Sequence, residues 1–317
     1  MRQGESRSGP LPHGSLLVFV GVCTMDTIAA VDGYPEPDSR SLARALVRAG
    51  GGPAATAAVA AARLGCQTSL ISAVGDDADG RAIIAELQAE GVGVDAVRQA
   101  ADEASGASSV TIDLKQHTRA IVNRPPPSLD VDSPEARATL ARAHWVHADQ
   151  AGLAVFDSPS CAPSSLRSYD GGNPARDLDV SGLDLYAPTV RQLASQFPEQ
   201  TDIGGMMRSA RRAGASRVVV TDGPQGAYAM DVDTDAVAHV PAASGAVSST
   251  LGAGDVFHGA LVAALAAEHD LLTSVAIANT VAVASCSGLD GRSAVPALSI
   301  RDTTLDDLAL QGDISWL

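Results

Sequence analysis

A glycine turn that opens a long apolar helix is the strongest constraint in this sequence. Gly252-Ala253-Gly254 is followed by Asp255 and by an apolar run that predicts a helix to about Glu268. Small residues let a ligand approach the backbone, and the free N–H groups at a helix N-terminus bind anions. Asp255 lies where its carboxylate can take a proton from an attacking hydroxyl. The pattern predicts phosphoryl transfer to an alcohol, but alone it is equally typical of a capped helix start.

A second glycine turn lies much earlier in the chain and opens another alanine-rich helix. Gly50-Gly51-Gly52 precedes Pro53, and the helix is predicted to end before Gly65, at a position that favours glycine. Two ordered signatures of this kind are far more specific than either one alone. Through them the chain resembles the PfkB, or ribokinase-like, family of carbohydrate kinases from about residue 16 onward.

The resemblance implies an α/β fold, a ribokinase-like three-layer sandwich whose central, mostly parallel sheet carries helices on both faces, with a small β lid. Buried apolar runs predict strands near 16–22, 67–74, 145–149, 166–170, 183–187 and 216–221. Segments at about 24–48 and 107–124 are expected to supply the lid strands. Residues 15–317 are expected to form the kinase domain, behind a disordered polar leader at 1–14.

Composition excludes several other functions. The chain has 317 residues, 45% of them hydrophobic, which is enough to bury a large core. Its formal charge of −15 argues against nucleic acid and anionic membranes as partners, because both require a basic patch. Lys115 is the only lysine, so a Walker A loop is absent. No apolar run reaches the ~20 residues that span a bilayer, and we expect a cytoplasmic protein.

The resemblance also implies a sugar site. Asp26, after the first predicted strand, matches the acid that binds sugar hydroxyls in the family, although alone it is more typical of a turn cap. Gly51 and Gly52 are expected at the same site. Asn123 and Arg124, on the lid hairpin, are candidate substrate contacts, since family members use such strands as a lid over the sugar. The lid is also expected to form a homodimer interface.

Within the family, the likeness is closest to sulfofructose kinases, through the segments Gly50 to Thr56, Gly252 to Leu261 and Gly291 to Pro296. In their pattern, an arginine that holds the sulfonate follows the acid at the end of a strand, and Gln150 takes that place here. An amide binds hydroxyls but lacks the bidentate fork of arginine. The expected substrate is therefore a ketose or a sugar acid, phosphorylated on a hydroxymethyl group.

ATP is the expected phosphoryl donor. Thr221, Gly223 and Gly226 match a family turn that lies against the phosphates and ribose of the nucleotide. Without the resemblance, this stretch is more typical of a hairpin turn. Asn279, on a late buried helix, matches a position near the adenine.

Magnesium is implied as the companion of ATP, but two family positions differ here. The Asn-x-x-Glu that organises magnesium is replaced by Pro188 to Gln192, a segment with no carboxylate, so the ion would be held mainly by water and phosphates. A monovalent cation binds near Ser249 and Cys286 in many relatives, but Ser249 stands in place of their aspartate. Dependence on K⁺ stays open at this point.

Two alternatives remain beside the sugar kinase. An aromatic base pocket would favour a nucleoside kinase of the same fold. Because only 3% of the residues are aromatic, this alternative ranks behind a sugar kinase. A sugar-binding protein without turnover is suggested by the missing Asn-x-x-Glu and by Ser249, while the intact motif from Gly252 to Asp255 argues against it. His258, three residues after Asp255, is expected to be a packed core histidine.

Overall fold

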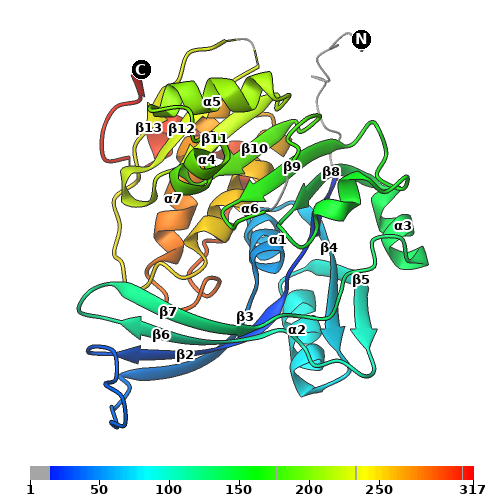
Figure 1. Cartoon of the computed structure of the whole chain (residues 1–317), viewed down its shortest axis with the longest axis vertical. Helices are drawn as coiled ribbons and strands as arrows, with labels where there is room; N and C mark the ends of the chain where they lie inside the picture. Colours follow the sequence, from blue (N-terminus) through cyan, green and yellow to red (C-terminus); the bar gives the residue numbers. More distant parts are fainter. Residues whose placement is uncertain (1–14, 176–177, 233, 309) are drawn as a thin grey trace.

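A ten-stranded sheet forms the centre of the computed structural model, which describes residues 15–175, 178–232, 234–308 and 310–317 (Figure 1). The expected leader at 1–14 lies outside these ranges. Strand order is β14-β13-β12-β11-β10-β9-β8-β1-β4-β5, parallel from β5 to β11 and antiparallel from β11 to β14. The strands are β1 (Leu16–Val20), β4 (Gln67–Gly75), β5 (Val92–Ala100), β8 (Ala143–Ala148), β9 (Leu166–Gly171), β10 (Leu185–Pro188), β11 (Arg217–Thr221), β12 (Ala227–Met230), β13 (Ala238–Val240) and β14 (Ser315–Trp316). The expected strands are all present, with ends displaced by at most two residues.

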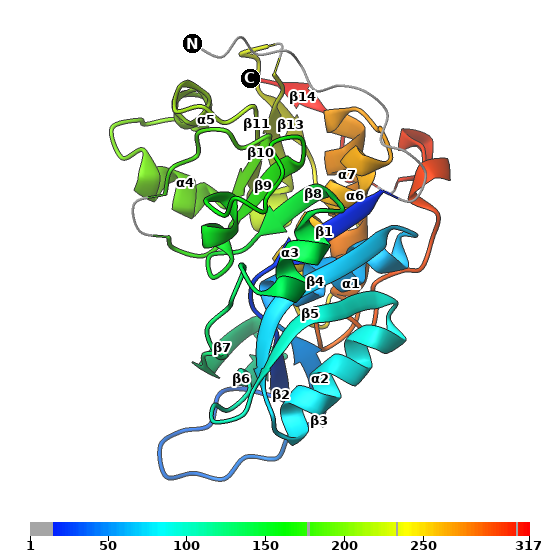
Figure 2. The same ribbon diagram turned by 90° about the vertical axis from the view of Figure 1, so that its right-hand side faces the viewer.

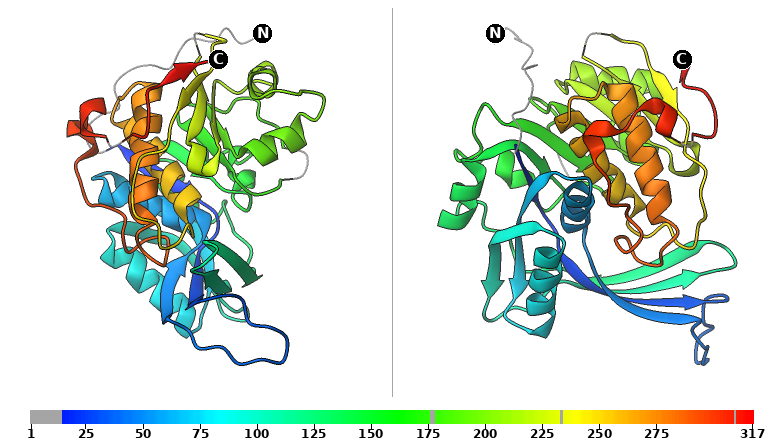
Figure 3. Two further views of the ribbon diagram at one scale, coloured as in Figure 1. Left: turned by 90° about the vertical axis from the view of Figure 1, so that its left-hand side faces the viewer. Right: turned by 180° about the vertical axis from the view of Figure 1, so that it is seen from behind.

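Helices cover both faces of this sheet and make it the middle of three layers, which confirms the expected sandwich. One face carries α1 (Pro53–Arg63), α2 (Ala78–Ala89), α6 (Ala253–Ala266) and α7 (Leu271–Ser285), of which α6 and α7 are seen from behind in Figure 3; the other carries α3 (Pro134–Leu140), α4 (Val190–Gln196) and α5 (Ile203–Arg212). Side chains of β1 alternate between the two cores, so Leu17 and Phe19 face α1 while Val18 faces α3. None of the helices in the described part of the chain has the length and apolar character that a bilayer crossing needs.

A second, four-stranded sheet is set apart from the first, as Figures 1 and 2 show, and we call it the lid. Its strands, in the order β3-β2-β6-β7, are β2 (Thr24–Val31), β3 (Ala45–Gly51), β6 (Ala107–Asp113) and β7 (Thr118–Arg124). Ile28, Val110 and Ile112 are buried on one face of the lid, where Leu251 and Leu289 pack against them. The small separate sheet expected as a lid is therefore confirmed, and its buried face looks toward the glycine turn at Gly252.

Close packing of α1 against α6 brings the two glycine turns together. A Cβ added to Gly259 of α6 would overlap the carbonyl oxygen of Ala57 in α1, so the helices touch backbone to backbone. Gly52 is the N-cap of α1 and Gly252 the N-cap of α6, both with positive φ values of 91° and 73°. The shared contact therefore directs both helix N-termini at one place.

We expect Gly259→Ala to lower the free energy of unfolding by about 1–3 kcal/mol, because the new methyl group must push the helices apart. Denaturant unfolding measures the change. Gly204→Ala in α5 is the matched control, since the added Cβ meets only the flexible guanidinium of Arg208 at 3.1 Å. That control is expected to be neutral or to gain up to about 1 kcal/mol from helix propensity. Equal stability of the two variants would contradict the packing argument.

Candidate active site

A cavity of about 970 Å³ lies between the lid and the carboxyl ends of the parallel strands, the edge at which open α/β sheets bind ligands. We call it the central cavity. The residues expected at the site that line it are Asp26, Gly51, Gly52, Asn123, Gln150, Thr221, Gly252, Gly254 and Asp255. The structure does not bring Ala253, Arg124, Gly223, Gly226 or Asn279 to its wall.

The turn before α6 presents backbone donors to the central cavity. Val256 N donates to Gly252 O at 2.9 Å, so the N–H groups before it precede the helical ladder. Ala253 N donates weakly to Thr250 O at 3.4 Å, which leaves Gly254 and Asp255 as the freer donors. Arg119 of the lid donates to Thr250 Oγ1 at 2.7 Å and places a positive charge beside this turn. Backbone dipole and guanidinium together favour an anion here.

Asp255 itself lies in the first turn of α6, half-buried against the central cavity. Burial, together with the nearby Asp170 carboxylate, raises the pKa of Asp255 to about 7, while His258 acts in the opposite direction. A carboxyl group with a pKa near neutrality is well matched to accept a proton from a hydroxyl.

Three polar side chains form a row across the lid. Asp26 pairs with Ser108 in the β2–β6 register, Ser108 pairs with Asn123 in the β6–β7 register, and all three line the central cavity. Asp26 is 8% exposed, and its Oδ1 has no hydrogen-bond partner within the described residues. Gly51 must lack a side chain because a Cβ there would overlap the Asp26 carboxylate. A buried acceptor that faces a cavity is suited to a ligand hydroxyl.

Arg124 lies on the opposite face of the lid from Asn123. Its Nε and Nη2 donate to the Ser105 carbonyl at 3.0 and 2.9 Å. Adjacent residues of a strand point to opposite faces, so only one of the two candidates can face the sugar. Gln150 lies at the mouth of the cavity, where its Oε1 accepts from Asn173 at 3.4 Å.

Two buried charges that the sequence did not single out hold the first glycine turn in place. Asp149 accepts from Val22 N at 2.7 Å and from Ala54 N at 3.3 Å, and so joins β1 to the start of α1. Arg292 donates to Gly51 O at 2.7 Å and to Thr56 Oγ1 at 3.2 Å.

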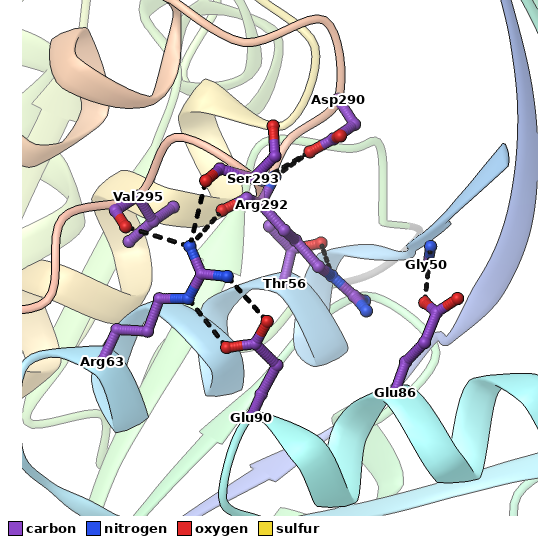
Figure 4. A network of polar contacts seen from close by, with 9 residues as sticks. All are labelled: Gly50, Thr56, Arg63, Glu86, Glu90, Asp290, Arg292, Ser293 and Val295. Atoms are coloured by element: carbon purple, nitrogen blue, oxygen red, sulfur yellow. Dashed lines mark hydrogen bonds and ion pairs between the residues drawn. The ribbon is translucent and has the colours of Figure 1, made fainter. Parts of the chain in front are cut away.

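A network of neighbouring contacts, drawn in Figure 4, secures the loop that carries Arg292. Arg63 Nη1 donates to the carbonyls of Arg292 and Val295 at 2.6 and 3.0 Å, while its Nε and Nη2 bond Glu90. Glu86 Oε2 accepts from Gly50 N at 2.9 Å. The turn is thereby fixed from α1, α2 and the loop after α7 at once.

Asp170 and His258 form a buried ion pair at the wall of the central cavity. His258 Nε2 lies 3.1 Å from Asp170 Oδ1. The expectation of a packed histidine is confirmed, since His258 is 3% exposed and its ring lies 5.5 Å from that of His147. The carboxylate partner was not foreseen. The only available signal was that Asp170 ends a predicted strand, the edge where ligands bind.

Of the residues expected to bind the nucleotide, one lines the central cavity and the others lie away from its wall. Thr221 lines the central cavity at the end of β11. Gly223 and Gly226 lie in the turn between the antiparallel strands β11 and β12, so the hairpin interpretation of this stretch also holds. Asn279 is buried on α7 and donates to Val240 O and Pro241 O at 3.1 and 3.0 Å, which fixes the chain after β13.

Protein ligands for cations are scarce at this site. The described residues contain no group of three or more His, Cys, Asp or Glu side chains that could hold a metal ion. At the position of the missing Asn-x-x-Glu, β10 ends at Pro188, and Thr189 caps α4 through Gln192 N. Ser249 Oγ accepts from Leu251 N at 3.1 Å, and Ser249 N donates to Cys286 O at 3.1 Å.

Comparison with known proteins identifies the family of the chain. The pfkB family carbohydrate kinase domain matches residues 15–165 and 184–298. Fructokinase from Klebsiella pneumoniae is 31% identical over 301 residues, which cover 86% of this chain and 95% of that protein. Ribokinase from Bacillus subtilis is 26% identical over 292 residues, with 88% and 96% covered. The closer likeness to sulfofructose kinases is not confirmed by these relatives.

Solved structures show the same fold. Ribokinase from Arabidopsis thaliana, complexed with ribose and ATP, has a TM-score of 0.76 at 19% identity, over 89% of this chain and 96% of that one. The family match extends over most of the described residues, on both sides of the segment that carries Asp170. The chain therefore belongs to the pfkB family of carbohydrate kinases and is a sugar kinase.

Proposed function

We propose that the protein transfers the γ-phosphoryl group of ATP to a hydroxymethyl group of a neutral sugar, with Asp255 as the general base. The observation that carries this proposal is the shared cavity, which holds the polar row of the lid at one side and the α6 turn at another. A sugar bound through Asp26 would present its hydroxymethyl group to Asp255. Proximity of this kind turns a bimolecular reaction into an effectively unimolecular one.

In this mechanism the chain supplies a base and an anion hole. Asp255 accepts the hydroxyl proton as the sugar oxygen bonds to the γ-phosphorus and the bond from that phosphorus to ADP breaks. The N–H groups of the Gly252 to Gly254 turn, chiefly that of Gly254 with that of Asp255, face the charge that develops on the phosphoryl oxygens. Phosphoryl transfer requires little covalent chemistry from a protein, so positioning and charge stabilisation dominate.

ATP and Mg²⁺ are the cofactors of the proposal. The ATP-bound ribokinase with the same fold supports the nucleotide. Magnesium neutralises the β- and γ-phosphates when bound, and here it would be held through those phosphates and water, since the described residues offer no cluster of acidic ligands. The proposed mechanism includes no potassium ion, because Ser249 brings no carboxylate to the loop before α6.

A neutral sugar fits the charges of the central cavity better than a sugar acid or a sulfo-sugar. Arg119 is the only arginine or lysine among the described residues that line it, and this guanidinium is engaged at Thr250. Arg119 lies four residues from Asn123 along β7, roughly 13 Å from the polar row. No guanidinium is therefore available to form the bidentate pair that a carboxylate or sulfonate favours.

A nucleoside fits less well than a sugar. None of the described residues that line the central cavity is Phe, Tyr or Trp, so no ring is available there to stack against a base. A binding protein without turnover is disfavoured because Asp255 and the α6 turn keep the arrangement that proton transfer and anion binding require.

We also infer a homodimer formed through the lid. The edge strand β7 is exposed along its whole length, and Val122 and Leu46, on the face away from the cavity, are 76% and 73% exposed. An exposed sheet edge beside apolar side chains favours pairing with a second chain.

Asp255→Asn is expected to lower kcat by about 10²- to 10⁴-fold, because the amide cannot accept the proton. The assay is ADP release from Mg-ATP with fructose, ribose, sulfofructose, a 2-keto-3-deoxy sugar acid and ribonucleosides. We expect turnover on a neutral sugar only. The amide keeps the size of the side chain, so an unchanged melting temperature serves as the control. Near-full activity of Asp255→Asn would refute the assignment of the base.

The pH dependence of kcat/KM follows from the raised pKa of Asp255, about 7. The base must be ionised, so kcat/KM is expected to rise about tenfold per pH unit below that value and to level off above it. Initial rates at subsaturating sugar from about pH 5 to about pH 9 measure the profile. A profile that stays flat down to pH 5 would show that no group titrating near neutrality limits the reaction.

Val122→Glu is expected to convert the dimer to a monomer, since it places a charge in the proposed apolar contact. Sedimentation velocity measures the mass. Leu317→Glu, at another exposed apolar residue, outside the lid and next to the edge strand β14 of the ten-stranded sheet, is the control. A wild-type protein that sediments as a monomer would disprove the inferred dimer.

A further inference from the structure

We propose that His258, held by the Asp170 carboxylate, is a positioning residue that keeps the Asp255 base ionised at neutral pH. The inference rests on the proposed function for the role of Asp255. It goes further by assigning a task to a buried ion pair whose hydrogen bonds, within the described residues, run to each other and to Gly172 N.

The surroundings of Asp170 stabilise an ionised carboxylate. Asp170 is 4% exposed, and its Oδ1 also accepts from Gly172 N at 2.7 Å, so the carboxylate is fixed from two sides. His258 is equally buried, and its Nδ1 has no hydrogen-bond partner within the described residues. A buried carboxylate needs a paired cation or several donors to stay ionised. His258 is the side chain in position to provide that cation.

The pair lies directly behind the base. Asp255 and His258 are three residues apart on α6, so their side chains lie on the same face of the helix. Asp170 reaches this face from the end of β9, and all three side chains line the central cavity. A change in the charge of either partner therefore acts on Asp255 at short range.

Other charged groups also surround Asp255. They are Asp149 after β8, Arg119 on β7 and Arg292 in the loop after α7, and His147 on β8 lies beside His258. Burial holds the pKa of His147 at about 3, so that ring is neutral. Asp149 and Asp170 oppose ionisation of Asp255, whereas His258 and Arg119 favour it. If Asp170 were present without the charge of His258, Asp255 would face the carboxylates of Asp149 and Asp170 with no neighbouring imidazolium to offset them.

Protonation of His258 follows from the same contact. Burial opposes the charged imidazole, but the charge and hydrogen bond of Asp170, together with the Asp255 carboxylate, outweigh burial and raise the pKa of His258 above its usual value. The protonated pair is net neutral, and its positive end adjoins Asp255 on α6. Without that positive end, Asp255 would become a base only at higher pH.

The test uses pH profiles of kcat/KM for sugar phosphorylation in wild type and three variants. His258→Gln keeps a hydrogen-bond donor for Asp170 but removes the positive charge of the imidazolium. The acid limb of the profile, where kcat/KM rises with pH, is expected to move up by about one to two pH units. Asp170→Asn removes a negative charge from beside Asp255 and is expected to leave the limb at or below the wild-type pH. The double variant removes both charges and is expected to return the limb toward the wild-type pH.

His147→Gln is the matched control, because it removes a buried but neutral histidine next to the pair and is expected to leave the limb in place. If His258→Gln lowers the rate equally at all pH values, His258 only fills space and the inference is overturned. An upward shift in Asp170→Asn overturns it as well.

A second readout does not depend on turnover. The ¹³C carboxyl signal of Asp255, assigned by its loss in Asp255→Asn, is expected to titrate at higher pH in His258→Gln than in wild type. If no sugar is phosphorylated but this shift is present, the proposed function fails and the electrostatic role of His258 stands. If sugar is phosphorylated and the shift is absent, the role of His258 fails and the proposed function stands.

Discussion

The site depends on the backbone contact between α1 and α6. Each helix begins at a glycine turn, and each turn faces the cavity only because the two helices lie close enough for Gly259 to meet the carbonyl of Ala57. A side chain at that point would separate the helix axes and pull the turns apart. The sheet beneath supplies area to bury, but this contact sets the distance between the sugar side and the phosphoryl side of the cavity.

An acidic protein that binds a nucleotide must solve its electrostatics locally. The chain carries a formal charge of −15, so its long-range field repels phosphates. Close to the cavity, this repulsion is offset by the helix N-terminal N–H groups at the α6 turn and by the guanidinium of Arg119 beside it. The charges of the buried acids are likewise stabilised by donors in direct contact with them. Asp149 is held by backbone N–H groups and Asp170 by His258 and Gly172 N.

Local patterns predicted most of the fold, because apolar runs and helix caps act over a few residues. Asp77 illustrates this, since it caps α2 by accepting a hydrogen bond from Gly80 N, three residues along the chain, at 2.7 Å. The turn from Gly252 to Asp255 was predictable from a contiguous motif, whereas Asp26, Asn123 and Gln150 were expected at the cavity only through the family resemblance. The Asp170–His258 pair joins residues 88 positions apart, and a histidine in an apolar helix gives no sign of its partner. Asn123 and Arg124 were both expected at the substrate, but neighbours on a strand point to opposite faces, and only Asn123 lines the cavity.

That alternation gives the loop between β6 and β7 an unexpected importance. Asp113 and Thr118 close the hairpin, and Asp113 Oδ1 accepts from Lys115 N and Gln116 N at 2.8 and 3.2 Å, which fixes the length of the loop. An inserted residue that shifted the pairing of β7 with β6 by one position would exchange the two faces of β7. Asn123 and Arg119 would then leave the cavity and Arg124 would enter it, so the guanidinium would move from beside the α6 turn to the side of the polar row. The length of this loop therefore decides which face of β7, and with it which side chains, meets the central cavity.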